Sequence, residues 1–284
     1  MSDLLAALLL GIIEGITEFL PISSTGHLLI AEHWLGARSE LFNIAIQAGA
    51  ILAVVLIYWR RLWGMLLAFV GRDAPAAFDP LGISTTPAQS RDYAFKLVAA
   101  FAVTAVLGLL VKKLGWELPD DIRPVAWALV IGALWMVGAE WLAARRAARD
   151  GERVAIGWTV AILVGVAQVV AGVFPGTSRS AATIFVALLA GTTSRAAATE
   201  FAFVVGIPTM FAATGYELLK LCKGGGIGSE DWAALGVAFV ASAITAFVAV
   251  KWLLRYIQSH RFTAFAVYRV VLGMALLLWL PAGR

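Results

Sequence analysis

The stretch Phe174-Pro-Gly-Thr-Ser-Arg-Ser-Ala-Ala-Thr183 decides how the chain folds, because it interrupts an otherwise apolar run. Proline followed by glycine ends a helix and lets the backbone turn. Arg179 lies deep in this apolar setting, where an arginine is costly unless it meets an anion or a water-filled cavity. Hydroxyls and N–H groups at the start of the next helix suit an anion, above all phosphate. The stretch alone fits a phosphate site and a kinked transmembrane helix with an arginine–carboxylate pair about equally well.

The composition of the whole chain indicates a membrane protein. Of its 284 residues, 61% are hydrophobic and 14% are charged, and the mean hydropathy is +0.87. A soluble domain of this length would need far more charge on its surface. The apolar runs are long enough for helices rather than barrel strands. The net charge of +4 gives no sign of nucleic-acid binding, and the single cysteine, Cys222, excludes an internal disulfide.

A second interrupted apolar run opens the chain. Residues 4–20 carry Glu14 and Glu18 and then meet Pro21, and a helical pattern resumes over Ser23–Leu35. Neither piece comfortably spans a bilayer, which takes about 20 helical residues. We therefore expect two half-helices in a re-entrant hairpin, whose break is shielded by protein or faces a water-filled cavity.

Six further apolar segments are predicted to be full transmembrane helices. They are Phe42–Trp59, Leu97–Val111, Val125–Ala143, Thr199–Leu219, Trp232–Leu254 and Phe262–Leu280. A second broken pair, Ile156–Phe174 and Ser180–Gly191, lies between the third and the fourth of them. The polar residues 60–96 are expected to form a loop, at most with a surface helix. Loops 60–96 and 145–153 are rich in arginine, so the positive-inside rule places them in the cytoplasm.

The pattern of breaks and spans predicts an internal repeat. A shift of 154 positions lays Gly11 on Gly165, Glu14 on Gln168, Pro21 on Pro175 and Ser24 on Ser178. Each broken pair is followed by three spans, which gives halves 1–143 and 156–280 within one membrane domain, 1–284. An odd number of spans inverts the second half, and such repeats place their site near the midplane. The predicted fold class is an all-α polytopic membrane protein with an inverted repeat, about six transmembrane helices and two re-entrant helical hairpins.

The residues of the first break are suited to chemistry. Glu14 and Glu18 lie four apart and share one helix face. Two carboxylates there can hold a divalent cation or act as acid and base, and a proton-coupled transport site is the alternative. Ser24 is a candidate nucleophile with His27 as its base. A lone histidine is more often a packing residue, but the neighbouring glutamates and hydroxyls favour a functional one.

Arg179 supplies the fixed positive charge that the first break lacks. Its planar fork matches a pair of phosphoryl oxygens. Phosphoryl transfer needs mainly positioning and neutralisation of oxygen charge, which Arg179, the hydroxyls and a cation on the paired glutamates would supply. Glu200 is left between two roles, as a residue of the site and as a structural partner of Arg179.

Two segments resemble the signatures of bacterial undecaprenyl-diphosphate phosphatases, also called bacitracin-resistance proteins. They are Glu14-Gly-Ile-Thr-Glu-Phe-Leu-Pro-Ile-Ser-Ser-Thr-Gly-His27 and Phe174-Pro-Gly-Thr-Ser-Arg-Ser-Ala-Ala-Thr183. Tyr58-Trp-Arg-Arg-Leu62 and Glu200-Phe-Ala-Phe203 also match that family's pattern, and the similarity covers essentially the whole chain. The resemblance implies hydrolysis of undecaprenyl diphosphate to the monophosphate and phosphate, which recycles the carrier lipid of peptidoglycan and cell-wall synthesis. It also implies a bacterial inner-membrane enzyme whose site opens towards the periplasm.

The resemblance also implies roles for individual residues. The catalytic set carried over from the family is Glu14, Glu18, Ser24, His27 and Arg179. The substrate-binding residues would be Ser23, Thr25, Gly176, Thr177, Ser178, Ser180 and Thr183. The family is described as needing Mg²⁺ or Ca²⁺, for which Glu14 and Glu18 would be the ligands. The expected partners are undecaprenyl diphosphate and membrane lipid, with no nucleic acid, and a homodimer is left open.

Two alternatives remain at the level of sequence. An activated water can replace Ser24 as the attacking group. A transporter or flippase for polyprenyl phosphate could use the same pocket, because inverted repeats with broken helices are also a transporter architecture.

Overall fold

The computed structural model describes residues 2–75, 78–79, 81–84, 86–115, 122–224 and 230–279. These residues form ten helices and no strand. The helices are α1 (Asp3–Thr17), α2 (Ser24–Leu35), α3 (Glu40–Phe69), α4 (Pro87–Lys113), α5 (Ile122–Asp150), α6 (Trp158–Val173), α7 (Arg179–Ala190), α8 (Arg195–Gly224), α9 (Trp232–Ser259) and α10 (Thr263–Trp279). Five of them, α3, α4, α5, α8 and α9, are long and apolar enough to cross a membrane, and α10 is a shorter apolar helix. The all-α polytopic membrane fold is confirmed, although residue 280 at the end of the last predicted span lies outside the described residues.

The predicted loop 60–96 is wrong at both of its ends. Helix α3 continues past Trp59 to Phe69, and α4 begins at Pro87 behind the N-cap of Thr86. The charges of Arg60-Arg61 do not end α3, because Arg61 is only 5% exposed and is paired with carboxylates inside the protein. Arg61 of this basic pair therefore marks a buried ionic contact rather than the end of a span.

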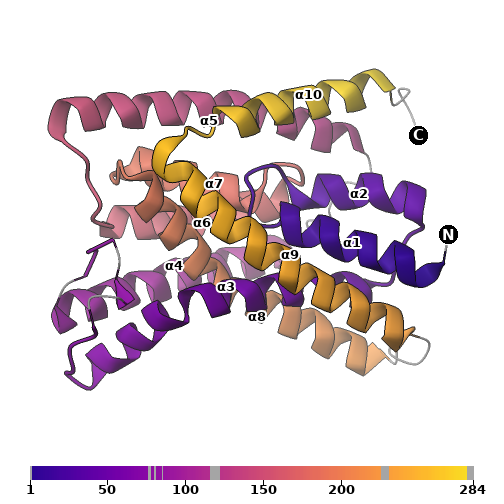
Figure 1. The fold of residues 1–284 in the computed structure, drawn as a ribbon, viewed down its shortest axis with the longest axis horizontal. Coiled ribbons are helices and arrows are strands. Elements are labelled where there is room, and N and C mark those ends of the chain that lie inside the picture. Colours follow the sequence, from indigo (N-terminus) through magenta and orange to yellow (C-terminus); the bar gives the residue numbers. More distant parts are fainter. Residues whose placement is uncertain are drawn as a thin grey trace.

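The two broken pairs enter the molecule from opposite ends. In Figure 1, α1 and α2 reach in from the right-hand end, where both termini lie, and α6 and α7 reach in from the left. The four half-helices have 15, 12, 16 and 12 residues, each short of the roughly 20 that span a bilayer. The Ser180 hydroxyl donates to the Leu20 carbonyl at 3.0 Å, so the two breaks touch inside the protein.

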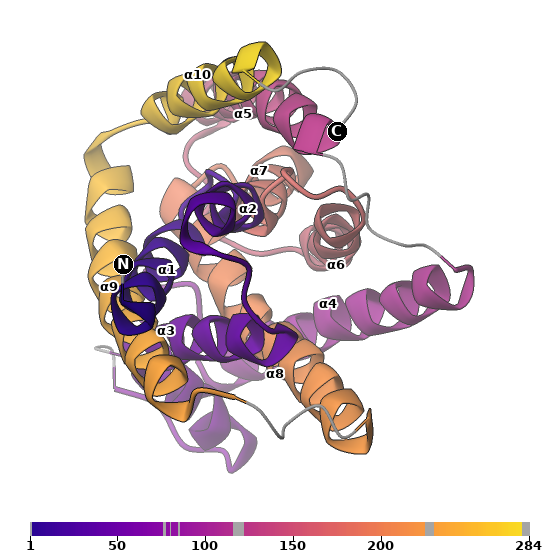
Figure 2. The same ribbon diagram turned by 90° about the vertical axis from the view of Figure 1, so that its right-hand side faces the viewer.

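Each half-helix pair packs on a long helix from the other part of the chain. Helix α1 packs against α9, and α6 packs against α4, while α5 and α10 lie side by side (Figure 2). A Cβ built on Gly11 would lie 2.3 Å from the Ala238 carbonyl oxygen, and one on Gly165 would lie 2.6 Å from that of Ala100. Glycine is thus required at both contacts, because any side chain would force the helices apart.

Two serines end the breaks in the same unusual conformation. Ser23 and Ser178 have φ of 74° and 69°, and no other non-glycine residue in the described ranges has positive φ. Each caps the helix that follows, accepting from Gly26 N and Ala181 N respectively. The left-handed conformation costs a non-glycine residue of order 1–3 kcal/mol and persists only where the surroundings impose it. Because both serines are N-caps, Ser23 is the structural equivalent of Ser178. The predicted alignment paired Ser24 with Ser178 and is therefore shifted by one residue at the break.

Candidate active site

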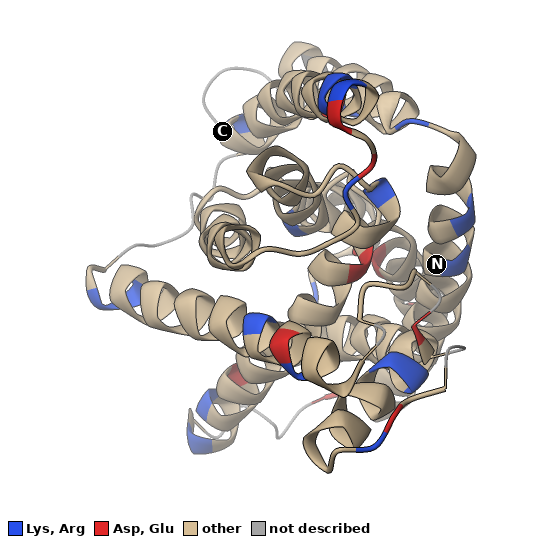
Figure 3. Ribbon diagram, turned by 90° about the vertical axis from the view of Figure 1, so that its left-hand side faces the viewer, with Lys and Arg blue, Asp and Glu red and all other residues tan. Residues whose placement is uncertain are grey.

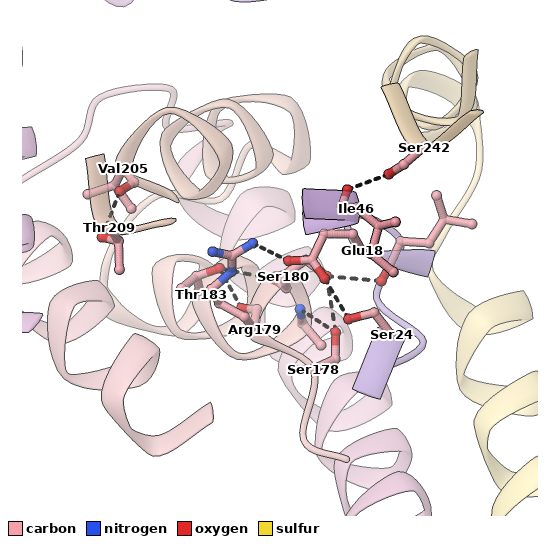
Figure 4. Close-up of polar contacts among 12 residues, drawn as sticks. Glu18, Ser24, Ile46, Ser178, Arg179, Ser180, Thr183, Val205, Thr209 and Ser242 are labelled. Carbon is pink, nitrogen blue, oxygen red and sulfur yellow. Dashed lines mark hydrogen bonds and ion pairs between the residues drawn. The ribbon is translucent and has the colours of Figure 1, made fainter. Parts of the chain in front are cut away.

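Glu18 is the residue on which the two breaks converge. It follows α1 as its C-cap. Arg179 Nη2 donates to Glu18 Oε1 at 2.5 Å, and Ser24 Oγ donates to Glu18 Oε2 at 2.5 Å (Figure 4). The Arg179 and Glu18 side chains are 22% and 10% exposed, so water screens their pairing only weakly. Arg179 therefore has the anionic partner that its apolar position requires, and this partner also holds the hydroxyl of Ser24.

Glu14 lies one helical turn before Glu18 and is fully buried. Neither of its carboxylate oxygens has a hydrogen-bond partner among the described residues. An isolated buried carboxylate is strongly unfavourable and is normally neutralised by a proton or a cation. Within the described part of the chain, no three His, Cys, Asp or Glu side chains come together as a ready-made metal cluster. Glu14 is thus a buried carboxylate without a hydrogen-bond partner among the described residues, whereas its neighbour Glu18 already accepts from Arg179 and Ser24.

His27 is held at both ring nitrogens, and neither contact is to Ser24. Nδ1 lies 2.7 Å from the Ser23 carbonyl, which can only accept, so Nδ1 carries a proton. In the neutral ring Nε2 then accepts from the Tyr268 hydroxyl at 2.6 Å, and the two rings stack 8° from parallel. The predicted Ser24–His27 pair does not form in this structure, because the Ser24 hydroxyl donates its hydrogen bond to Glu18 instead.

Most of the predicted substrate-binding residues build the breaks themselves. The hydroxyl of Ser178 accepts from Ala181 N and bonds the Ser180 hydroxyl, and Thr183 donates to the Arg179 carbonyl at 2.8 Å. Thr25 is exposed on the first turn of α2. The first N–H groups of a helix have no partner within it and attract an anion. The residues at the starts of α2 and α7 therefore suit a phosphate through their backbone more than through their hydroxyls.

Glu200, which the sequence left between two roles, does not pair with Arg179. Its Oε1 lies 3.2 Å from Arg61 Nε, and Arg61 Nη1 lies 3.1 Å from Asp79 Oδ2. Both Glu200 and Arg61 are buried. This cluster joins α3 and α8 to the connection after α3, so the predicted structural pairing of Glu200 with Arg179 is wrong and the carboxylate is instead paired with Arg61.

Sequence reasoning missed two residues of the site, Tyr268 and Arg269 on α10. Tyr268 bonds His27, and Arg269 bonds backbone carbonyls of both breaks. A signal for Arg269 was present, since it is an arginine inside an apolar run, the same feature that singled out Arg179. Tyr268 gave no such signal, because tyrosine is ordinary in an apolar helix.

An apolar cavity adjoins the second break. It has a volume of about 720 Å³ and lies between α5, α6 and α7. Trp127, Trp135, Phe174 and Val170 are on its wall, and Thr177 of the break is the one hydroxyl residue among the described residues that line it. Trp127, Phe174 and Val170 are also exposed on the outer surface of the molecule. The cavity therefore runs from the break towards the surface that faces lipid.

Fold and site together define a polytopic membrane protein whose polar site, made of carboxylates, hydroxyls and an arginine, lies where two broken helices meet. The chain belongs to the family described as bacitracin resistance protein BacA, whose model matches residues 7–275. It is 63% identical over 275 residues to the undecaprenyl-diphosphatase of Rhizobium etli (strain CIAT 652), covering 97% of this chain and 96% of that protein. It is 61% identical over 282 residues to the undecaprenyl-diphosphatase of Xanthomonas oryzae pv. oryzae (strain PXO99A), covering 99% of each.

Proposed function

We propose that this protein is an integral-membrane phosphatase that hydrolyses undecaprenyl diphosphate to undecaprenyl phosphate and inorganic phosphate. The observation that carries the proposal is the chain of contacts Ser24–Glu18–Arg179, in which a hydroxyl, a carboxylate and a fixed cation meet at the two helix breaks. Its relatives over nearly the full length are named for this hydrolysis. The product would be the carrier lipid returned to cell-wall synthesis.

Ser24 is proposed as the nucleophile and Glu18 as the group that takes its proton. The Ser24 hydroxyl already donates to Glu18, so a base is in place without movement of His27. Ser24 Oγ forms a bond to the terminal phosphorus, the bridging P–O bond breaks, and undecaprenyl phosphate leaves with the electron pair. Water then cleaves the phosphoserine and releases phosphate. Arg179 and the N-termini of α2 and α7 hold the phosphoryl oxygens throughout.

Glu14 and Glu18 are proposed to hold a divalent cation, Mg²⁺ or Ca²⁺. The fit rests on Glu14, whose two buried oxygens have no hydrogen-bond partner among the described residues. Mg²⁺ commonly takes one or two protein carboxylates and completes its shell with water and substrate phosphate, so a larger protein cluster is not required. When bound, the cation would neutralise charge on the diphosphate.

The polyprenyl chain is proposed to lie in the apolar cavity between α5, α6 and α7. Thr177 connects this cavity to the break that carries Arg179 two residues later. A chain attached to a phosphate at the break needs an apolar path at the same depth, and this cavity provides one that opens to lipid. Because the polyprenyl chain would leave lipid rather than water, close packing against the cavity wall, and not removal from water, would hold it there.

The protein is proposed to lie in the bacterial inner membrane with its basic end in the cytoplasm. Lysines and arginines lie at the end of the molecule that Figure 3 faces. In the sequence, Arg145 and Arg149 lie in the last turns of α5 and Arg153 follows it. By the positive-inside rule that end is cytoplasmic. The hairpin of α1 and α2 enters from the other end, so Ser24 and His27 would be reached from the periplasm.

The proposal is tested by phosphate release from undecaprenyl diphosphate with the purified protein in detergent. Release should depend on Mg²⁺ or Ca²⁺, should stop with chelator, and should be lost in the Arg179→Ala protein. Acid quenching should trap phosphoserine in the wild type and not in Ser24→Ala. If Ser24→Ala is fully active, the attacking group is an activated water and not the serine. If the folded wild type releases no phosphate, the proposed function is wrong.

A further inference from the structure

Arg269 is a completely buried arginine near the middle of α10, and all of its hydrogen bonds go to backbone carbonyls. Its exposed fraction is 0%. Nη1 donates to Pro21 and Thr177 at 3.2 and 3.0 Å, Nη2 donates to Gly176 and Ala128 at 3.1 and 3.0 Å, and Nε donates to Leu129 at 3.2 Å. All five N–H groups of the guanidinium are used.

These carbonyls belong to three separate parts of the chain. Pro21 lies in the first break, Gly176 and Thr177 lie in the second, and the other two are on α5. Carbonyls at a helix break have lost their helical partners and are costly when buried unpaired. One rigid guanidinium fork satisfies both breaks at once and fixes the distance between them. Ser24 lies three residues after Pro21, and Arg179 lies two residues after Thr177. The guanidinium fork of Arg269 therefore also fixes the side chains of Ser24 and Arg179 relative to each other.

The charge of Arg269 has no carboxylate partner within 4 Å in the described part of the chain. Carbonyl dipoles stabilise the cation but do not cancel it. Because no N–H remains free, Arg269 is not available to touch a phosphate directly. In a low-dielectric interior its field still reaches an anion bound at the neighbouring helix starts.

We propose that Arg269 is the positioning residue of the phosphate site, holding the two helix breaks in register and attracting the diphosphate through its charge alone. The inference rests on the proposed function for its substrate, although anion binding by itself can test it. If Arg269 only stabilised the fold, its substitution would change neither turnover nor anion affinity when the folded variant is compared with the folded wild type.

The experiment separates position from charge with Arg269→Lys and Arg269→Met. Lysine keeps the charge but offers three donors in place of five, so the breaks should loosen, and kcat should fall by about 10-fold to 10²-fold. The inhibition constant for inorganic phosphate should then stay within about 3-fold of wild type. Methionine removes both features, so kcat should fall further and phosphate inhibition should weaken by about 10-fold. Arg146→Met is the matched control, because Arg146 also donates to a carbonyl, that of Leu189 near the end of α7, which belongs to neither helix break.

The outcomes that overturn the proposal are distinct. Wild-type kcat and phosphate inhibition in folded Arg269→Met, with only a lower melting midpoint, would make Arg269 purely structural. If Arg269→Met does not fold, the test rests on Arg269→Lys. Equal losses of kcat and of phosphate affinity in Arg269→Lys would contradict the proposal that positioning of the breaks and attraction of the anion are separate roles. Binding of inorganic phosphate measured by calorimetry needs no turnover. A wild type that binds phosphate but releases none would therefore defeat the proposed hydrolysis, and phosphate affinity would still test Arg269: weaker binding in Arg269→Met than in Arg269→Lys supports its charge role, and equal binding overturns it.

Discussion

Ser24 and Arg179 occupy the same position in the two broken pairs and contact the same carboxylate. Each is the first residue of a half-helix, and each follows a serine cap with left-handed backbone. Ser24 donates to one oxygen of Glu18 and Arg179 donates to the other (Figure 4). One break thus presents a hydroxyl and the other a cation at equivalent places. The two similar backbone frames therefore differ in the side chain that each brings to Glu18.

Arg179→Lys should be a severe loss even though it keeps the charge. Arginine can bond Glu18 through one nitrogen and offer the others to phosphate, whereas a lysine ammonium has no such fork. We expect kcat to fall by about 10²-fold, and by about 10³-fold in Arg179→Ala, the scale of losing one transition-state donor or more. Rates of phosphate release at saturating lipid measure this. Equal activity of the lysine protein and the wild type would show that charge alone suffices.

Glu14→Gln should stabilise the protein while it removes activity. Replacing a buried, unpaired carboxylate by an amide removes a charge that the interior solvates poorly. In chelator the melting midpoint should rise by about 2 °C or more. Mg²⁺ or Ca²⁺ should raise the midpoint of the wild type and not that of the variant, since a ligand that binds only the folded state stabilises it. An identical cation-induced shift in both proteins would remove Glu14 from the cation site.

The helices and their breaks were predictable from sequence because their causes are local. Proline, Pro-Gly and the lengths of apolar runs are enough to place α1, α2, α6 and α7. Contacts within the site were not predictable in this way. The nearness of Ser24 and His27 in sequence suggested a pair, but His27 is taken by Tyr268, 241 positions later, and Ser24 by Glu18. Such choices depend on which helices meet, which periodicity does not reveal.

Tyr268→Phe should lower kcat while leaving the fold intact. Phenylalanine keeps the stacked ring beside His27 but removes the hydroxyl that donates to Nε2. Loss of a hydrogen bond of about 1 kcal/mol leaves the imidazole less firmly oriented, so a decrease of roughly 5-fold to 10-fold in kcat is expected. Steady-state kinetics would be compared with melting midpoints for the same preparations. If kcat stays at the wild-type value, His27 needs no orientation by Tyr268.

Val170→Trp should discriminate against long-chain substrates. Val170 is exposed and lines the apolar cavity, so a tryptophan would occupy space there without overpacking the core. We expect KM for undecaprenyl diphosphate to rise by about 10-fold, which corresponds to about 1.4 kcal/mol of lost binding free energy, with little change for a three-isoprene diphosphate. Val248→Trp on α9, also exposed but outside that cavity, is the control. Parallel changes for both chain lengths would place the polyprenyl chain elsewhere.

The native Cys222 should report which end of the protein faces the periplasm. It is the single cysteine of the chain, is exposed, and lies two residues before the end of α8, which in Figure 1 is on the side where α1 begins. A membrane-impermeant maleimide should therefore label it in intact spheroplasts. In a Cys222→Ser background, Arg149→Cys at the exposed basic end of α5 should react only after permeabilisation. The reverse labelling pattern would show that the protein has the opposite orientation in the membrane. Ser24 and His27 would then be reached from the cytoplasm, and the arginines at the other end would break the positive-inside rule.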